Sequence, residues 1–288
     1  MQESEAFQND VSREDYLKLV KFSSDFFFGQ VMQDPHICAQ VLSVLLNAKI
    51  KGARVEGIEY LTAQKSLKAD SDSYGVNLDV YVKDKNGSVY DVELQNYKME
   101  AAGQRVREYQ IQIDAENFKR GMSYKEMSAS YILFICTFDP FGAGECVYSF
   151  SLTCDENPVI KLNDNTVKVF YNTKQWAKCK DKDLQALLRY IETGEATSPL
   201  TKQIEAFLER EKRQQKWRNS PMVTFAMKLE DARKTGREEG RKTGAWEKAI
   251  STAKKALQHN IPLDVIADLT SLPAEEITSL SQSATVLN

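Results

Sequence analysis

The chain has 288 residues, of which 42% are hydrophobic and 27% are charged, and its formal net charge is −3. This balance is typical of a soluble globular protein and excludes collagen-like, generally disordered and multi-span membrane proteins. No apolar run approaches the roughly 20 residues that span a bilayer. The acidic, polar N-terminus lacks a secretory signal, so we expect a cytoplasmic protein with no membrane partner.

Histidine and cysteine offer little for catalysis. The only histidines are His36 and His259, which are too few for a multi-histidine zinc site and offer little basis for a Ser-His-Asp triad. The five cysteines are an odd number without a Cys-x-x-Cys pair, a pattern that favours free thiols over a disulfide framework. If the chain is an enzyme, we expect carboxylates and amides to carry its chemistry.

The charge is unevenly distributed. Residues 202–255 hold 15 basic and 8 acidic side chains, whereas residues 256–288 hold 4 acids and no Lys or Arg. A basic segment can attract phosphates even within an acidic chain. The alternative is a solvated helix with mixed charges, which the pattern alone favours.

The N-terminal part is predicted to be helical over 12–50. Pro35 is expected to begin a second helix after a break, with Asp34 as its N-cap. Residues 54–69 carry β-type side chains among polar ones, which predicts a strand. The next two segments, 76–83 and 89–95, alternate between apolar and polar residues and flank Asn86-Gly87, so they predict a β-hairpin.

Helices and strands then alternate, which predicts an α/β fold with a mixed sheet. An amphipathic helix over 99–120 is expected to end at Gly121, and the apolar run 131–138 is expected to form a strand buried on both faces. The remaining candidates are strands at 146–153 and 166–171 and helices at 181–193 and 199–232.

The composition changes after about residue 200. Residues 233–244 contain Arg-Lys-Thr-Gly twice, and their glycines favour a linker or a frayed helix. The predicted parts are a main domain at 1–200, a basic helical extension at 201–232, a Gly-rich charged linker at 233–245 and a small helical element at 246–288. The second helix expected there begins Ala274-Glu275-Glu276 and lacks basic residues, so we interpret this element as a packing or dimerisation device, with a possible homodimer.

The register of the hairpin follows from its loop. Alternation places Leu78 and Val80 on one face and Asp79 on the other. A loop of two residues would set Val80 opposite Glu93 and mix the faces, whereas a three-residue loop, 85–87, sets Val80 opposite Val92 and Asp79 opposite Glu93. Because burial of one apolar face strongly selects the register, we predict the second pairing.

This register brings two carboxylates together. The Cβ atoms of Asp79 and Glu93 would lie about 4.5–5.5 Å apart, with Gln95 on the same face. Such a pair repels itself unless a cation or a proton intervenes, and hard oxygen ligands favour Mg²⁺ or Mn²⁺. The alternative is a solvated polar strand face, which the spacing alone favours over a metal site.

The strings Asn77–Val82 and Tyr90–Gln95 resemble the active-site hairpin of the PD-(D/E)XK nuclease superfamily. More narrowly, they resemble its branch of recombination-promoting nucleases and transposases (Rpn). Further matches are Arg105 with Tyr109, Gly121–Tyr124, Cys136–Gly142 and Leu188–Ile191. The resemblance extends from about residue 20 to 280. It implies a restriction-endonuclease-like core with a mixed central sheet flanked by helices, followed by a helical C-terminal tail.

The resemblance also implies roles for the hairpin residues. Asp79 and Glu93 would ligate Mg²⁺ or Mn²⁺, with the Leu94 carbonyl as a third oxygen, and Gln95 would complete the catalytic group where many superfamily members have lysine. Arg105 would bind a DNA phosphate and Tyr109 would position it. The implied activity is a metal-dependent DNA endonuclease associated with recombination or mobile elements.

Two observations support other readings. Arg105 can instead form a surface pair with Glu108 or Glu116. Many superfamily members carry a glutamate on the first helix, but no acid lies between Pro35 and Ile50, so that ligand is missing or comes from Asp34 or Glu59. The alternative function is a catalytically silent module that keeps the nuclease fold and binds DNA or a protein.

Overall fold

A computed structural model describes residues 12–47, 55, 57–68, 76–215, 217–218, 221–258, 261–273, 275–276 and 278. The chain divides into two compact units, Met1–Thr224 and Phe225–Asn288. In the first unit the α-helices are α1 (Arg13–Leu19), α2 (Asp25–Met32), α3 (Pro35–Asn47), α4 (Ala102–Asn117), α5 (Lys182–Thr193) and α6 (Pro199–Gln214). Two short 3₁₀ helices are η1 (Tyr124–Glu126) and η2 (Thr173–Lys178). The strands are β1 (Ile58–Leu67), β2 (Val76–Asp84), β3 (Val89–Gln95), β4 (Ser130–Cys136), β5 (Val147–Phe150) and β6 (Thr166–Asn172).

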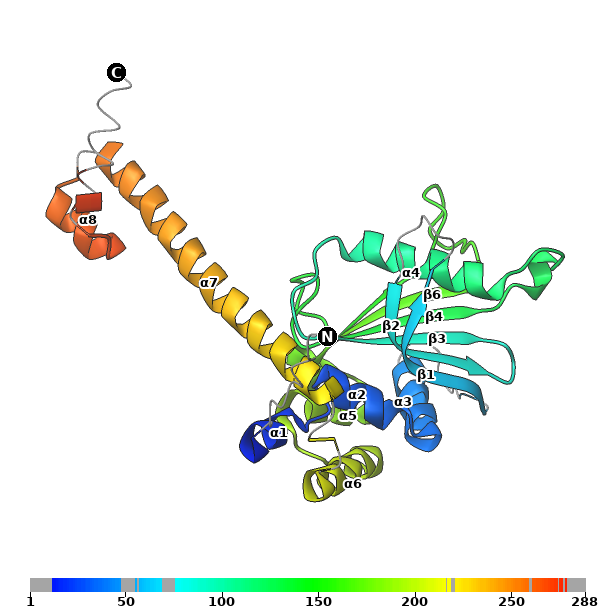
Figure 1. The fold of residues 1–288 in the computed structure, drawn as a ribbon. Helices are drawn as coiled ribbons and strands as arrows, with labels where there is room; N and C mark the ends of the chain where they lie inside the picture. Colours follow the sequence, from blue (N-terminus) through cyan, green and yellow to red (C-terminus); the bar gives the residue numbers. More distant parts are fainter. Residues whose placement is uncertain are drawn as a thin grey trace, which may run out of the picture. The chain divides into compact units, whose positions relative to one another are not determined.

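One mixed sheet organises the first unit. Its strand order is β1-β2-β3-β4-β6-β5, with β3, β4 and β6 parallel and the other neighbours antiparallel. Helix α4 covers one face, and α2 and α3 lie against the other, with α5 and α6 packed on these helices (Figure 1). This arrangement confirms the predicted α/β fold. It also explains why the apolar β4 is buried along almost its whole length.

The break before α3 is as predicted. The Asp34 carboxylate accepts hydrogen bonds from the backbone N–H groups of His36 (2.9 Å) and Ile37 (3.1 Å). It therefore caps the helix, and Pro35 occupies the first helical position, where a missing N–H costs nothing.

Two helix ends differ from the predictions. Helix α4 ends at Asn117 instead of Gly121, and the Lys119 ammonium donates to the Ala115 carbonyl, one of the last four that lack an intrahelical partner. The predicted helix 199–232 is interrupted, since Gln215 adopts a left-handed conformation that ends α6 and Pro221 begins a new helix.

The hairpin register is confirmed from Lys83–Val89 to Val80–Val92, but the predicted pairing of Asp79 with Glu93 is absent from the ladder, because the strands part there. Val80 pairs with Val92, and the backbone N–H of Asp84 donates to the Ser88 carbonyl at 3.0 Å, which closes the three-residue loop. Gly87 has a φ of +79°, the left-handed conformation that such a loop needs.

Cys146 and Cys179 form a disulfide, with Cα atoms 5.6 Å apart, which corrects the expectation of free thiols throughout. Cys146 immediately precedes β5, and Cys179 immediately follows η2. Their 33-residue separation concealed this proximity because the fold, not the sequence spacing, brings the two segments together. The other three cysteines are free.

The second unit contains most of α7 (Pro221–Gln258) and α8 (Leu263–Thr270). Ala253 and Ala256 of α7 pack with Ile266 and Leu272 in a small core. Residues 233–245, the predicted linker, are helical within α7. Glycine weakens a helix by about 1 kcal/mol, but unlike proline it keeps its backbone N–H, so the helix continues. Most of the predicted helix at 274–281 lies outside the described residues.

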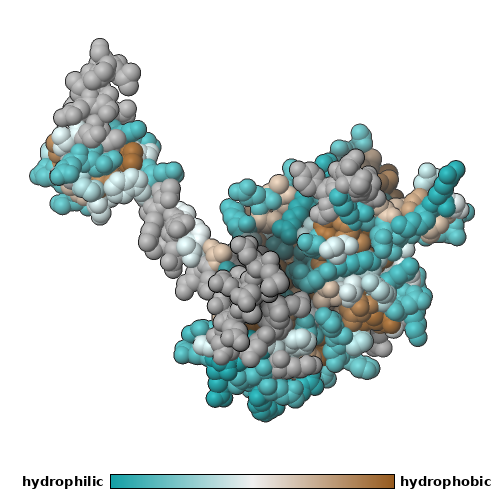
Figure 2. Space-filling view, in the orientation of Figure 1, coloured by the Kyte–Doolittle hydropathy of each residue, from teal (hydrophilic) through white to brown (hydrophobic). Residues whose placement is uncertain are grey.

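The view in Figure 2 shows a mainly hydrophilic surface with separate hydrophobic areas. Within the described part of the chain, none of the helices has the length and apolar character needed to cross a membrane.

Asp84 stabilises the hairpin turn in a way that the sequence did not reveal. Its carboxylate accepts from the N–H groups of Asn86 and Ser88, both at 2.9 Å, and from the Tyr90 hydroxyl at 2.8 Å. We expect Asp84→Ala to lower the free energy of unfolding by about 2–4 kcal/mol, because three donors lose their charged acceptor. Urea unfolding measures this loss. Tyr90→Phe removes one of these bonds and should cost about 1 kcal/mol; equal losses in both variants would contradict the assignment.

Candidate active site

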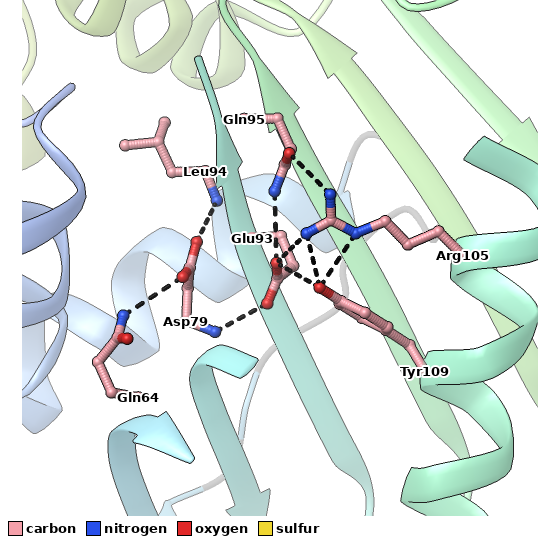
Figure 3. A network of polar contacts seen from close by, with 7 residues as sticks. All are labelled: Gln64, Asp79, Glu93, Leu94, Gln95, Arg105 and Tyr109. Atoms are coloured by element: carbon pink, nitrogen blue, oxygen red, sulfur yellow. Dashed lines mark hydrogen bonds and ion pairs between the residues drawn. The ribbon is translucent and has the colours of Figure 1, made fainter. Parts of the chain in front are cut away.

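Strands β2 and β3 part at Asp79 and Glu93. Their ladder ends at the pair Val80–Val92, beyond which β2 continues beside β1 and β3 continues beside β4. Side chains bridge the opening: the Asp79 N–H donates to Glu93 Oε1 at 2.8 Å, and the Leu94 N–H donates to Asp79 Oδ2 at 3.1 Å. Each carboxylate is therefore held by the backbone of the opposite strand (Figure 3).

The second oxygen of Glu93 faces α4. Glu93 Oε2 accepts from Gln95 Nε2 at 3.4 Å and from the Tyr109 hydroxyl at 3.3 Å, and Arg105 Nη2 lies 3.9 Å away. Arg105 in turn donates to the Tyr109 hydroxyl (2.8 and 3.2 Å) and to Gln95 Oε1 (3.4 Å). These four residues form one network around a carboxylate that is only 1% exposed (Figure 3).

The helical spacing explains how α4 supplies two of these groups. Arg105 and Tyr109 are four residues apart, so they lie one above the other on the face of α4 that packs against the sheet. Tyr109 is 5% exposed, whereas the Arg105 side chain is 40% exposed. The guanidinium therefore touches the network from the solvent side.

The alternative partners predicted for Arg105 are wrong. Glu108 accepts a hydrogen bond from Gln112 at 2.9 Å. Glu116 pairs with Lys65 at 3.2 Å and with Lys119 at 3.9 Å. Neither glutamate pairs with Arg105, whose contacts are those of the Glu93 network.

Asp91 is a third carboxylate of this region that we did not single out from the sequence. It is fully buried, and among the described residues neither of its oxygens forms a well-aligned hydrogen bond, although the Glu93 carboxyl lies close enough to lower its pKa. Strand alternation places it on the same face as Glu93 and Gln95, which was the available signal. The sequence does not show that α4 covers this face, so Asp91 looked like an ordinary solvated residue.

Burial makes these carboxylates difficult to ionise. It raises the pKa of Asp79 from its ordinary value near 3.8 to about 6, and the nearby charge of Asp25 adds to this shift. The pKa values of Asp91 and Glu93 are raised well above their usual range, first by burial and then by neighbouring carboxylates. Arg105 opposes all three shifts, but its half-exposed charge does not cancel them.

Asp25, the first residue of α2, lies near enough to Asp79 for its charge to raise the pKa of that carboxyl. Asn96, directly after β3, donates to Asp25 Oδ1 at 2.8 Å and to the Ser23 carbonyl at 3.0 Å, which ties the start of α2 to the end of β3. The predicted sources differ: the Asp34 carboxylate caps α3, and Glu59 is exposed on β1. Asp25 begins α2, which precedes the range 35–50 in which the sequence contains no acid.

The donor set suits a divalent cation. Asp79 and Glu93 offer carboxylate oxygens, and burial raises the pKa of both, so a bound cation would favour their charged forms. In the described part of the chain, no three His, Cys, Asp or Glu side chains converge as a metal site. Mg²⁺ commonly binds through one or two carboxylates and keeps several waters, so two ligands fit its usual coordination.

Comparison with known proteins agrees with the resemblance seen in the hairpin. A family model described as PD-(D/E)XK nuclease family transposase matches residues 23–259. No curated protein and no solved structure matches the chain. The match supports a restriction-endonuclease-like core for the mixed sheet and its flanking helices.

The raised pKa values predict how stability depends on pH in the metal-free protein. Because the folded state binds these protons more tightly than the unfolded chain, the free energy of unfolding should fall as the pH rises above about 4. Asp91→Asn replaces a buried carboxyl that is difficult to ionise with a neutral amide, so at pH 8 we expect it to be more stable than the wild type by about 1–3 kcal/mol, with little difference at pH 4.

Urea unfolding in EDTA at several pH values measures this dependence. Asp155→Asn is the matched control, because Asp155 is exposed and lies outside the site. A destabilised Asp91→Asn at pH 8 would show that the Asp91 charge is compensated in the fold.

Proposed function

The chain belongs to the family of PD-(D/E)XK nuclease family transposases, and on that premise we propose that it is a metal-dependent DNA endonuclease of the cytoplasm, associated with recombination or mobile elements. One observation carries the proposal. Asp79 and Glu93 face each other where β2 and β3 part, and each is anchored by the opposite strand. Each carboxylate keeps lone-pair capacity beyond these hydrogen bonds, so each could also ligate a metal ion.

Asp79 and Glu93 would hold Mg²⁺ or Mn²⁺, and the Leu94 carbonyl would add a third oxygen. When bound, the ion supplies charge neutralisation at a phosphate oxygen and activates water for attack. Both carboxyls must lose their protons to bind it. The Asp79 pKa of about 6 therefore favours binding at neutral over acidic pH.

Arg105 provides the positive charge that glutamine at position 95 lacks. Its Nη1 donates to Gln95 Oε1 at 3.4 Å, so a guanidinium lies beside the position that lysine fills in many superfamily members. The guanidinium is planar and partly exposed, which suits bidentate contact with a phosphate. Tyr109 holds it in place through two hydrogen bonds. The amide of Gln95 orients Glu93.

Removal of either ligand should abolish both metal binding and cleavage. We expect Asp79→Asn and Glu93→Gln to lower Mn²⁺ affinity by more than about 100-fold in calorimetry, and to stop nicking of plasmid DNA. Glu59→Gln, on the exposed surface of β1, is the control and should behave as the wild type. Undiminished nicking by Asp79→Asn would contradict the assignment of Asp79 as a metal ligand.

Arg105 should contribute to DNA affinity through one phosphate contact. With metal removed by EDTA, we expect Arg105→Ala to weaken binding to a short duplex, and to reduce the slope of log affinity against log salt by about 1. Arg107→Ala is the matched control, because Arg107 is two residues along α4 and exposed. An equal change in both variants would argue for a general charge effect.

The second candidate is an interaction module that keeps the fold without catalysis. Two observations favour it: no acid lies between Pro35 and Ile50, and the described carboxylates do not form a three-ligand group. Calorimetry separates the candidates. Mn²⁺ uptake that depends on Asp79 supports the enzyme, and its absence, with DNA affinity retained, supports the module.

A further inference from the structure

Gln64 lies in the middle of β1 in a conformation that strands do not normally contain. Its φ is +56°, in the left-handed region that disfavours residues with a Cβ atom. Its neighbours are paired regularly, Ala63 with Val80 and Lys65 with Leu78. The left-handed residue therefore sits inside the ladder, at the level of Asp79.

Side-chain alternation reverses at this level. Leu78 and Tyr81 are three residues apart, yet both belong to the core cluster under α4. On β1, Lys65 places its ammonium 5.1 Å from the Tyr60 ring and 3.8 Å from the Tyr81 ring, although Tyr60 and Lys65 are five residues apart. Strict alternation would separate the members of both pairs. The prediction that Leu78 shares a face with Val80 is therefore wrong, and the reversal explains why.

The left-handed residue also places an amide beside the proposed metal ligand. Gln64 Nε2 donates to Asp79 Oδ1 at 3.3 Å, while the Leu94 N–H holds Asp79 Oδ2 at 3.1 Å (Figure 3). Each carboxylate oxygen thus has one protein donor, and each keeps lone-pair capacity for another partner. The hydrogen bond from the Gln64 amide also favours the charged form of Asp79, and so lowers the pKa of Asp79 against the effect of burial.

Glycine would meet the demands of the backbone better than glutamine does. It adopts positive φ without steric cost, so a purely structural reversal of the strand does not require a side chain at this position. Gln64 is exposed, so burial does not explain its side chain either. The remaining explanation for a strained glutamine at this position is its hydrogen bond to Asp79.

We propose that Gln64 is a positioning residue for Asp79, whose amide holds the carboxylate in the orientation that receives the metal ion. This proposal rests on the proposed function, because it assigns Gln64 to the same site. It predicts two separate effects: loss of the Gln64 side chain should weaken metal binding, and relief of the backbone strain at this position should stabilise the fold.

Two variants of the full-length chain separate these effects. Gln64→Gly removes both the amide and the strain, so we expect its midpoint of urea unfolding to rise and its Mn²⁺ affinity to fall by about tenfold. Gln64→Met keeps the length of the side chain and the strain but lacks a donor, so its affinity should fall equally without a gain in the midpoint. Gln215→Gly is the matched control, because Gln215 has a φ of +48° at the end of α6. It should raise the midpoint and leave Mn²⁺ affinity unchanged.

Calorimetry with Mn²⁺ in the absence of DNA and urea unfolding in EDTA provide the readouts. Wild-type Mn²⁺ affinity in both Gln64 variants would overturn the proposal while leaving the proposed function intact. A lowered midpoint in Gln64→Gly would also overturn it, since the loss of affinity would then reflect a damaged fold. If the wild type takes up no Mn²⁺ that depends on Asp79, the proposed function and this proposal both fail.

Discussion

The opening between β2 and β3, and the two hydrogen bonds that cross it, determine the rest of the site. Where a sheet divides, backbone N–H groups lose their partners and must find others. Here the Glu93 carboxylate accepts from the Asp79 N–H, and the Asp79 carboxylate accepts from the Leu94 N–H. Each carboxylate therefore accepts a backbone hydrogen bond that the divided sheet would otherwise lose, and this bond helps to keep the two acids close together. Arg105 and Tyr109 of α4 contact Glu93 of this pair, and the amide of Gln64 contacts Asp79.

Much of the fold could be predicted because local patterns agreed with one another. The loop over 85–87 and the alternating strands were consistent with only one register, and the structure has that register. The cap at Asp34 was equally visible, since its partners are two and three residues away. These features depend on neighbours in the chain, which a sequence shows directly.

The features that escaped prediction depend on packing between distant segments. Asp91 is unusual only because α4 covers its face of the sheet, and Asp25 matters only because α2 begins beside the end of β3. The left-handed backbone of Gln64 has no signature, since glutamine is not a residue that favours this conformation. As a result, the predicted faces are correct on the hairpin side of Asp79 and reversed beyond it.

The cluster of acids at the candidate site sets folding stability against the proposed chemistry of these residues. Asp79, Asp91 and Glu93 resist ionisation in the folded state, so this region stores unfavourable free energy at neutral pH. Selection for heat resistance alone would replace these residues first, because neutral side chains pack there at lower cost. A thermostable variant obtained without a functional screen should therefore carry its changes in the candidate site.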